Sequence, residues 1–201
     1  MNKGKLIVFS APSGCGKGTM LSKILEDKQF YCSISVTTRA PRDGEVNGVN
    51  YYFITRDEFK QRIENNGMLE YAEYCNNYYG TPLKEVNEQL NSGKDVILEI
   101  EVKGAMKIRE ICPEAIFIFV VPTSLAELER RLHKRGTETD DIIKKRVSAA
   151  AEEIPYASKY DYVIVNDVLE VAVNDFKTVI KAERLKAKYA DELLDEVMKN
   201  A

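Results

Sequence analysis

The feature that most constrains the fold is a short apolar run that leads directly into a glycine-rich turn, at residues 5–19 (KLIVFSAPSGCGKGT). Gly14 and Gly16 can adopt backbone angles closed to other residues, so successive N–H groups of the turn can point inward toward one anion. The residues after the turn predict a helix over 19–28, whose N-terminal end adds positive potential. A buried strand, an anion-binding turn and a helix in this order are typical of an α/β fold.

The turn is similar to the GxxxxGK[ST] pattern, in which backbone N–H groups and a lysine hold the phosphates of a nucleoside triphosphate. Two positions depart from it, because Ala11 replaces the first glycine and Gly18 replaces the metal-binding hydroxyl residue, which leaves Thr19 as the nearest hydroxyl. The alternative is a flexible turn, but the strand-like run before it and the amphipathic helix after it favour a nucleotide site. The predicted ATP-binding residues of this turn are Ala11, Pro12, Ser13, Gly14, Cys15, Gly16, Lys17, Gly18 and Thr19.

Composition predicts a globular protein of the cytoplasm with one or two domains. The 201 residues are 44% hydrophobic and 30% charged, and the net charge of −3 argues against nucleic acid or an anionic membrane as a partner. The apolar run near the N-terminus is too short for a signal peptide or a membrane span. The 4 cysteines form no CxxC pair and there is 1 histidine, so neither a zinc site nor a disulfide framework is expected.

Continuous apolar runs separated by helical stretches predict a parallel sheet that is buried on both faces. These runs are residues 6–9, 96–100, 115–121 and 162–165. Between residues 36 and 90 glycines punctuate polar, tyrosine-rich segments, which predicts a smaller mixed subdomain inserted into the core.

Helix starts are marked by capping patterns. Thr55 with Glu58 and Ser124 with Glu127 have capping-box spacing, and we expect Pro82 to occupy the first position of another helix. Apolar residues recur at roughly helical spacing over 168–197, which predicts a packed or partner-facing helix rather than a membrane-surface helix, since its charges are mixed.

Two arginines in the inserted region are suited to a phosphate group. Arg39 and Arg42 flank Pro41, which stiffens the segment and keeps both side chains in one neighbourhood. Planar guanidinium groups can bind a phosphate through paired hydrogen bonds, which lysine cannot do. In isolation two solvated loop arginines would be the preferred interpretation, but a triphosphate site elsewhere in the chain favours a second phosphate site here.

Five motifs in order make the chain resemble the guanylate kinases to about residue 185. They are residues 11–19, 35–45, 77–81, 135–139 and 163–167. The resemblance implies a parallel-sheet P-loop core flanked by helices, with an inserted mixed α+β GMP-binding subdomain and a helical lid. The implied boundaries are a core of residues 1–35, 91–123 and 154–201, an insertion of residues 36–90 and a lid of residues 124–153.

The resemblance also implies the reaction, which is transfer of the γ-phosphoryl group of ATP to GMP, and to dGMP, with Mg²⁺, in purine nucleotide metabolism and GMP recycling. The residues that it implies for GMP are Ser35, Arg39, Arg42, Tyr51, Glu70, Tyr79, Thr81 and Glu101. The implied catalytic charges are Lys17, Arg39, Arg42, Arg131, Arg135 and Arg146, while Arg130 is expected on a solvated helix face. Asn166 matches an adenine-side position, and Glu99, where the family usually has an aspartate, is assigned to the metal through water.

The chemistry of guanine agrees with this assignment. Its N1–H and N2 amino groups are adjacent donors that one carboxylate such as Glu70 can accept, whereas adenine offers no such edge. Hydroxyls of Ser35 and Thr81 can donate to guanine O6. The acceptor phosphate is already an anionic nucleophile, so neither a protein nucleophile nor a general base is required. The alternatives for these residues are a surface strand position for Glu70 and plain packing for the tyrosines.

Two other functions stay open from the sequence. A guanylate-kinase-like module that binds phosphorylated peptides would keep the inserted region, but the intact Gly14, Gly16 and Lys17 and the arginines of residues 135 and 146 favour the enzyme. A kinase for another nucleoside monophosphate is opposed by Glu70 together with Ser35 and Thr81. The expected partners are therefore the small molecules ATP and GMP, and the sequence does not choose between a monomer and a homo-oligomer.

Overall fold

The computed structural model describes residues 3–74, 76–136 and 138–199, so Cys75 and Thr137 lie outside it. Its centre is a five-stranded parallel sheet in the order β2-β7-β1-β8-β9. The strands are β1 (Leu6–Ser10), β2 (Phe30–Cys32), β7 (Asp95–Glu99), β8 (Ile116–Val121) and β9 (Tyr162–Val165). All four strands predicted from apolar runs are confirmed, whereas β2 escaped prediction because it is a three-residue edge strand with partly exposed side chains.

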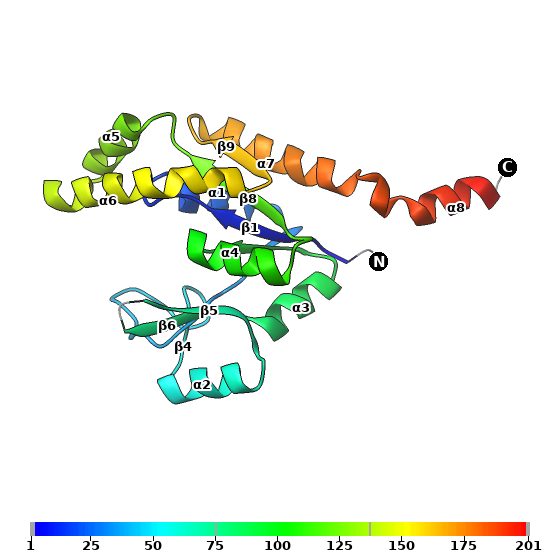
Figure 1. The fold of residues 1–201 in the computed structure, drawn as a ribbon, viewed down its shortest axis with the longest axis horizontal. Coiled ribbons are helices and arrows are strands. Elements are labelled where there is room, and N and C mark those ends of the chain that lie inside the picture. The colour runs from blue at the N-terminus through cyan, green and yellow to red at the C-terminus, as the bar shows by residue number, and fades with distance from the viewer. Residues whose placement is uncertain (1–2, 75, 137, 200–201) are drawn as a thin grey trace.

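Helices cover both faces of this sheet, as the burial of consecutive β1 side chains requires. Ile7 and Phe9 pack on one face with residues of α1 (Lys17–Ile24) and α7 (Leu169–Arg184). Val8 packs on the other face with residues of α3 (Leu83–Asn91) and α4 (Val102–Ile111). Figure 1 shows α7 and α4 on opposite sides of β1. The predicted α/β class is therefore confirmed.

A second, four-stranded sheet in the order β4-β3-β6-β5 lies beside the core (Figure 1). Its strands are β3 (Val36–Thr37), β4 (Tyr52–Phe53), β5 (Met68–Tyr74) and β6 (Asn77–Pro82), and β3 pairs parallel with β4 and antiparallel with β6. Helix α2 (Arg56–Glu64) packs on this sheet, with the buried Phe59 ring stacked 5.2 Å from the ring of Tyr78. Residues 36–82 thus form a mixed α+β unit, although the exact boundaries of the insertion stay a prediction.

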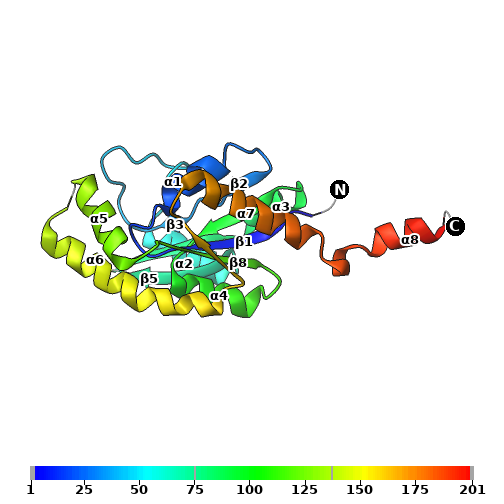
Figure 2. The same ribbon diagram turned by 90° about the horizontal axis from the view of Figure 1, so that it is seen from above.

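Two helices, α5 (Leu125–Arg135) and α6 (Asp140–Glu153), lie beyond the carboxyl ends of the central strands (Figure 2). A 3-10 helix, η1 (Ile154–Lys159), then leads into β9. Leu128 and Leu132 of α5 pack with Ile143 and Ala150 of α6, around the side chain of Cys15 from the glycine-rich turn. The predicted lid segment is therefore a helical pair seated on that turn.

Two of the three predicted helix starts need adjustment. Both hydrogen bonds of the Thr55 capping box are present. At Ser124 only the side-chain hydroxyl accepts from the Glu127 N–H, because the Glu127 carboxylate is bonded to Arg130 and Arg131 instead. Pro82 belongs to β6 and precedes the helix that begins at Leu83, so its predicted place inside the helix is wrong by one residue.

The helix predicted over 19–28 spans Lys17–Ile24. It begins early because the left-handed Gly16 is its N-cap, and it ends early because the chain must turn back at Asp27 to enter β2.

The C-terminal apolar pattern forms two helices. Helix α7 buries Phe176 and Ile180 in the core, whereas α8 (Asp191–Lys199) extends away from the body of the protein (Figures 1 and 2). Leu194, Val197 and Met198 of α8 are exposed. In the part of the chain that the structure describes, no helix is long and apolar enough to cross a membrane.

Candidate active site

The glycine-rich turn joins the end of β1 to α1 and has the predicted backbone geometry. Gly14 and Gly16 have φ angles of 95° and 80°, in the left-handed region that disfavours other residues. A Cβ at Gly14 would lie 2.8 Å from Leu132 Cδ2, and one at Gly16 would lie 2.6 Å from Asn166 Nδ2. Glycine is therefore required here both by conformation and by the close approach of neighbouring side chains.

Cys15 anchors this loop to the lid helices. Its side chain is fully buried among the apolar residues of α5 and α6, and burial raises the pKa of its thiol to about 12. A buried thiol that stays protonated behaves as a small apolar side chain. The Cys15 side chain therefore holds the loop against α5 and α6 through apolar packing.

The two departures from the GxxxxGK[ST] pattern have structural correlates. Ala11 packs against apolar clusters of both the core and the lid, so its methyl group fills space that a glycine would leave empty. Gly18 is exposed on the first turn of α1, and a Cβ there would meet nothing within 4 Å. Thr19 is also exposed on that turn, and Pro12 is buried beneath the loop.

Lys17 lies where the phosphate loop meets a cleft. Its Nζ is 3.5 Å from Oε1 of Glu99, at the end of β7. The cleft, with a volume of about 710 Å³, lies between the core and the smaller sheet. Its polar lining includes Lys17, Ser35, Tyr51, Glu99 and Glu101. One residue predicted for ATP, Lys17, therefore shares this cavity with three residues predicted for GMP, Ser35, Tyr51 and Glu101. Its lining does not include the other five residues predicted for GMP, which are Arg39, Arg42, Glu70, Tyr79 and Thr81.

Glu70 is a buried carboxyl group on β5, with 8% of its surface exposed, so it is not a surface strand residue. Thr81 of the neighbouring strand β6 donates a hydrogen bond from Oγ1 to Glu70 Oε1 at 2.8 Å. Burial raises the pKa of Glu70, while the Thr81 hydrogen bond acts in the opposite direction. A desolvated acceptor of this kind is strongly stabilised by a ligand that donates to it.

Arg39 stands among the aromatic residues of the smaller sheet. Its guanidinium group lies 5.5 Å from the Tyr51 ring centroid, and the rings of Tyr51 and Tyr79 meet edge to face at 6.1 Å. Arg39 Nη2 also donates to Glu45 Oε1 at 2.9 Å, which lowers the pKa of Glu45. These contacts place one guanidinium group beside the aromatic residues that are predicted to bind the acceptor phosphate with it.

Glu45 also organises the second arginine of the motif. Its Oε2 accepts a hydrogen bond from the backbone N–H of Arg42 at 2.8 Å, while the Arg42 side chain is exposed. Glu45 belongs to the motif of residues 35–45, but no role was predicted for its side chain. An acidic residue six positions after one predicted phosphate-binding arginine and three after the other was the signal.

The lid arginines occupy different places. Arg146 of α6 donates from Nη1 to Ser13 Oγ in the phosphate loop at 3.1 Å and pairs with Glu138. Arg135 is exposed at the end of α5, and among the described residues its side chain makes no ion pair. The structure therefore brings Arg146 to the loop and leaves Arg135 in solvent.

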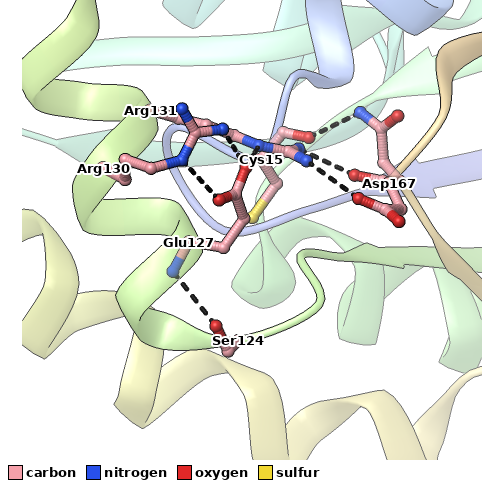
Figure 3. Close-up of polar contacts among 7 residues, drawn as sticks. Cys15, Ser124, Glu127, Arg130, Arg131 and Asp167 are labelled. Carbon is pink, nitrogen blue, oxygen red and sulfur yellow. Dashed lines mark hydrogen bonds and ion pairs between the residues drawn. The ribbon is translucent and has the colours of Figure 1, made fainter.

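Arg131 joins α5 to the end of β9 (Figure 3). Its Nε donates to Glu127 Oε1 at 2.6 Å, its Nη1 donates to the backbone oxygen of Asn166 at 2.7 Å, and Asp167 lies 3.8 Å from Nη2. Arg130 shares the same Glu127 carboxylate but stays on the exposed face, as the sequence predicts. The two arginines lower the pKa of Glu127 to about 2.

Comparison with known proteins identifies the family. The family described as Guanylate kinase matches residues 3–183. The chain belongs to the guanylate kinase family. The guanylate kinase of Latilactobacillus sakei subsp. sakei is 53% identical over 187 residues, which is 92% of each chain. That of Bacillus subtilis is 55% identical over 186 residues, or 92% of this chain and 91% of the relative.

A solved structure agrees with this family assignment. The crystal structure of guanylate kinase from Anaplasma phagocytophilum has a TM-score of 0.74 and 36% sequence identity, over 92% of this chain and 89% of that one. The resemblance predicted from the five motifs is therefore confirmed. The roles of individual residues stay predictions, because the comparisons do not address them.

The residues near Lys17 are suited to a magnesium ion that is held chiefly by nucleotide phosphates. Within residues 3–74, 76–136 and 138–199, no group of three or more His, Cys, Asp or Glu side chains could hold a metal by itself. Mg²⁺ commonly keeps several waters and takes one or two protein oxygens together with substrate phosphates. The exposed Thr19 hydroxyl and the Glu99 carboxylate beside Lys17 fit that limited role.

Glu153, at the end of α6, is a second acidic residue without a predicted role. Burial raises its pKa, as does the charge of Glu101, and the positive charge of Lys17 opposes both effects. The charges of Lys17 and Glu101, which line the cleft, therefore act on this carboxyl group of the lid segment. Neither spacing nor composition distinguished Glu153 from the other acidic residues of its helix.

Proposed function

We propose that the chain transfers the γ-phosphoryl group of ATP to GMP and produces ADP and GDP. The observation that carries this proposal is the cleft of about 710 Å³, because Lys17 of the phosphate loop and Ser35 and Tyr51 of the acceptor side all line it. A donor phosphate held by the loop and an acceptor phosphate held opposite can therefore meet without crossing solvent. Membership of the guanylate kinase family supports the same reaction.

The chemistry requires alignment and charge neutralisation. A phosphate oxygen of GMP attacks the γ-phosphorus of ATP, the bond from that phosphorus to the β,γ-bridging oxygen breaks, and ADP leaves with the electron pair. Lys17 and the N–H groups of the loop would stabilise the charge on the transferring group. Arg39 and Arg42 would hold the acceptor phosphate, assisted by Tyr51 and Tyr79.

Base selection would come from Glu70. Its buried carboxylate would accept hydrogen bonds from N1–H and the N2 amino group of guanine, and the Thr81 hydroxyl already bound to Oε1 would fix its orientation. Ser35 and Glu101 would complete the guanine site. dGMP presents the same base, so we propose that it is also accepted.

The helices α5 and α6 would act as the lid. Arg131 and Arg146 already contact the end of β9 and the phosphate loop, and Arg135 would reach the nucleotide phosphates only when the lid moves. Closure over both substrates would exclude water, which prevents loss of the phosphoryl group to hydrolysis.

Magnesium would bind with ATP, and Thr19 together with Glu99, through water, would hold it at the loop. When bound it supplies positive charge to the triphosphate. A cytoplasmic location is proposed as well, in keeping with unpaired cysteines and the small-molecule substrates.

A coupled assay that follows ADP formation tests the proposal. The full chain is given Mg·ATP and, in turn, GMP, dGMP, AMP, UMP and CMP. We expect rapid turnover with GMP and dGMP only. Equal turnover with AMP would contradict the base assignment, and binding of a phosphorylated peptide without any turnover would replace the enzyme by a recognition module.

A further inference from the structure

We propose that Asn166 is a positioning residue for the phosphate loop. Its side-chain amide holds the Cys15 carbonyl group outward and thereby aims the Gly16 N–H group at the phosphates of the nucleotide. The inference rests on the proposed function only in taking this loop as the ATP phosphate site.

The first step is the contact between Asn166 and the loop. Asn166 Nδ2 donates to the backbone oxygen of Cys15 at 2.8 Å, across 151 positions of sequence. In a planar trans peptide the C=O and N–H groups point in opposite directions. A Cys15 carbonyl directed at Asn166 therefore directs the Gly16 N–H away from it, toward the concave side of the loop.

The second step is that this N–H is free to bind an anion. Among the described residues the Gly16 N–H has no hydrogen-bond acceptor, whereas the Gly16 carbonyl is used by Met20 of α1. The loop conformation also depends on Gly16, because its φ is 80° and a Cβ would lie 2.6 Å from Asn166 Nδ2. Asn166 can therefore approach the loop this closely only because residue 16 is a glycine.

The third step is that Asn166 is fixed in place. Only 5% of its surface is exposed, its backbone N–H donates to Val121 at 2.9 Å, and its backbone oxygen accepts from Arg131. The bond from Nδ2 satisfies the Cys15 carbonyl group, and removing this buried donor would leave that acceptor unpaired. Because Arg131 of the lid donates to the Asn166 backbone oxygen, Asn166 contacts both the lid and the phosphate loop from the end of β9.

The test uses two substitutions that remove the donor, Asn166→Ala and Asn166→Asp. Asn166→Asp keeps the size but places a carboxylate against the Cys15 carbonyl. The matched control is Asn174→Asp, the same chemical change on the exposed face of α7. Affinities are measured for ATP, for inorganic tripolyphosphate as a ligand without a base, and for GMP, together with the melting temperature of each protein.

We expect both Asn166 variants to weaken ATP and tripolyphosphate by the same factor, roughly threefold to tenfold for Asn166→Ala and more for Asn166→Asp. Affinity for GMP and the properties of the control should stay at the wild-type level. If ATP binding falls while tripolyphosphate binding does not, Asn166 reads adenine and the inference is wrong. An equal loss of GMP affinity with a lowered melting temperature would make its role merely structural and would also overturn it.

The proposed function is judged separately by the wild-type protein. If the wild-type protein phosphorylates GMP and the Asn166 variants bind ATP and tripolyphosphate with wild-type affinity, only the positioning role is rejected. A wild-type protein that does not phosphorylate GMP would reject the proposed function, whatever the variants do.

Discussion

Replacing Glu70 with glutamine tests the guanine site most directly. The side chain is buried with 8% of its surface exposed, and Thr81 Oγ1 donates to Oε1 at 2.8 Å. Glutamine keeps the volume of this side chain but turns one acceptor into an amide donor. If the amide oxygen of glutamine keeps the hydrogen bond from Thr81, its NH2 group faces the N–H donors of guanine. Donors that cannot bond to each other are then buried without acceptors.

The size of the effect follows from the bonds that are lost. A hydrogen bond to a charged group contributes about 1.5–3 kcal/mol, so one spoiled bond lowers kcat/KM for GMP by roughly tenfold to a hundredfold. AMP offers no donor pair to this carboxylate and should not lose from the change. The ratio of kcat/KM for GMP to that for AMP must therefore fall by about tenfold or more.

The assay is steady-state kinetics with both nucleotides at fixed Mg·ATP. Glu73→Gln serves as the control, because Glu73 is an exposed carboxylate on the same strand whose partner is Arg56. Unchanged melting temperatures would show that both variants fold. An unchanged GMP-to-AMP ratio in the Glu70 variant would mean that this residue does not read the base and that the guanine pocket lies elsewhere.

Four further outcomes are expected. Lys17→Ala should lower turnover by about a hundredfold or more and keep GMP affinity, and near-normal turnover of a folded variant would reject the loop assignment. Adding ATP and GMP together should slow hydrogen exchange in residues 124–153, and identical exchange in the free protein would count against closure. Because burial raises the pKa of Glu70, GMP affinity should weaken as the pH falls through that raised pKa, with no such titration in Glu70→Gln. The raised pKa also means that the contribution of Glu70 to the free energy of unfolding declines as the pH rises above the unfolded value of about 4.3, as denaturant titrations can measure.

Features that depend on neighbours in sequence were predictable. The positive φ angles of Gly14 and Gly16, the Thr55 capping box and four of the central strands follow from local sterics, hydrogen bonding and apolar content. β2 was missed because three residues at a sheet edge carry too little pattern, and its place is decided by pairing with β7.

The sequence by itself determined that this chain contains a phosphate loop between a buried strand and a helix, because glycine conformation and apolar runs act over a few residues. Only the tertiary structure decided which polar groups are already paired. The sequence resemblance placed Asn166 on the adenine side, and only the structure shows that its amide donates to Cys15, which lies 151 positions away. The sequence predicted Cys15 only as one of the ATP-binding loop residues, and the structure shows that its side chain packs among the apolar residues of α5 and α6. Such pairings arise when strands and helices bring distant residues together and bury them, and a buried polar group must then take the partner that the packing provides.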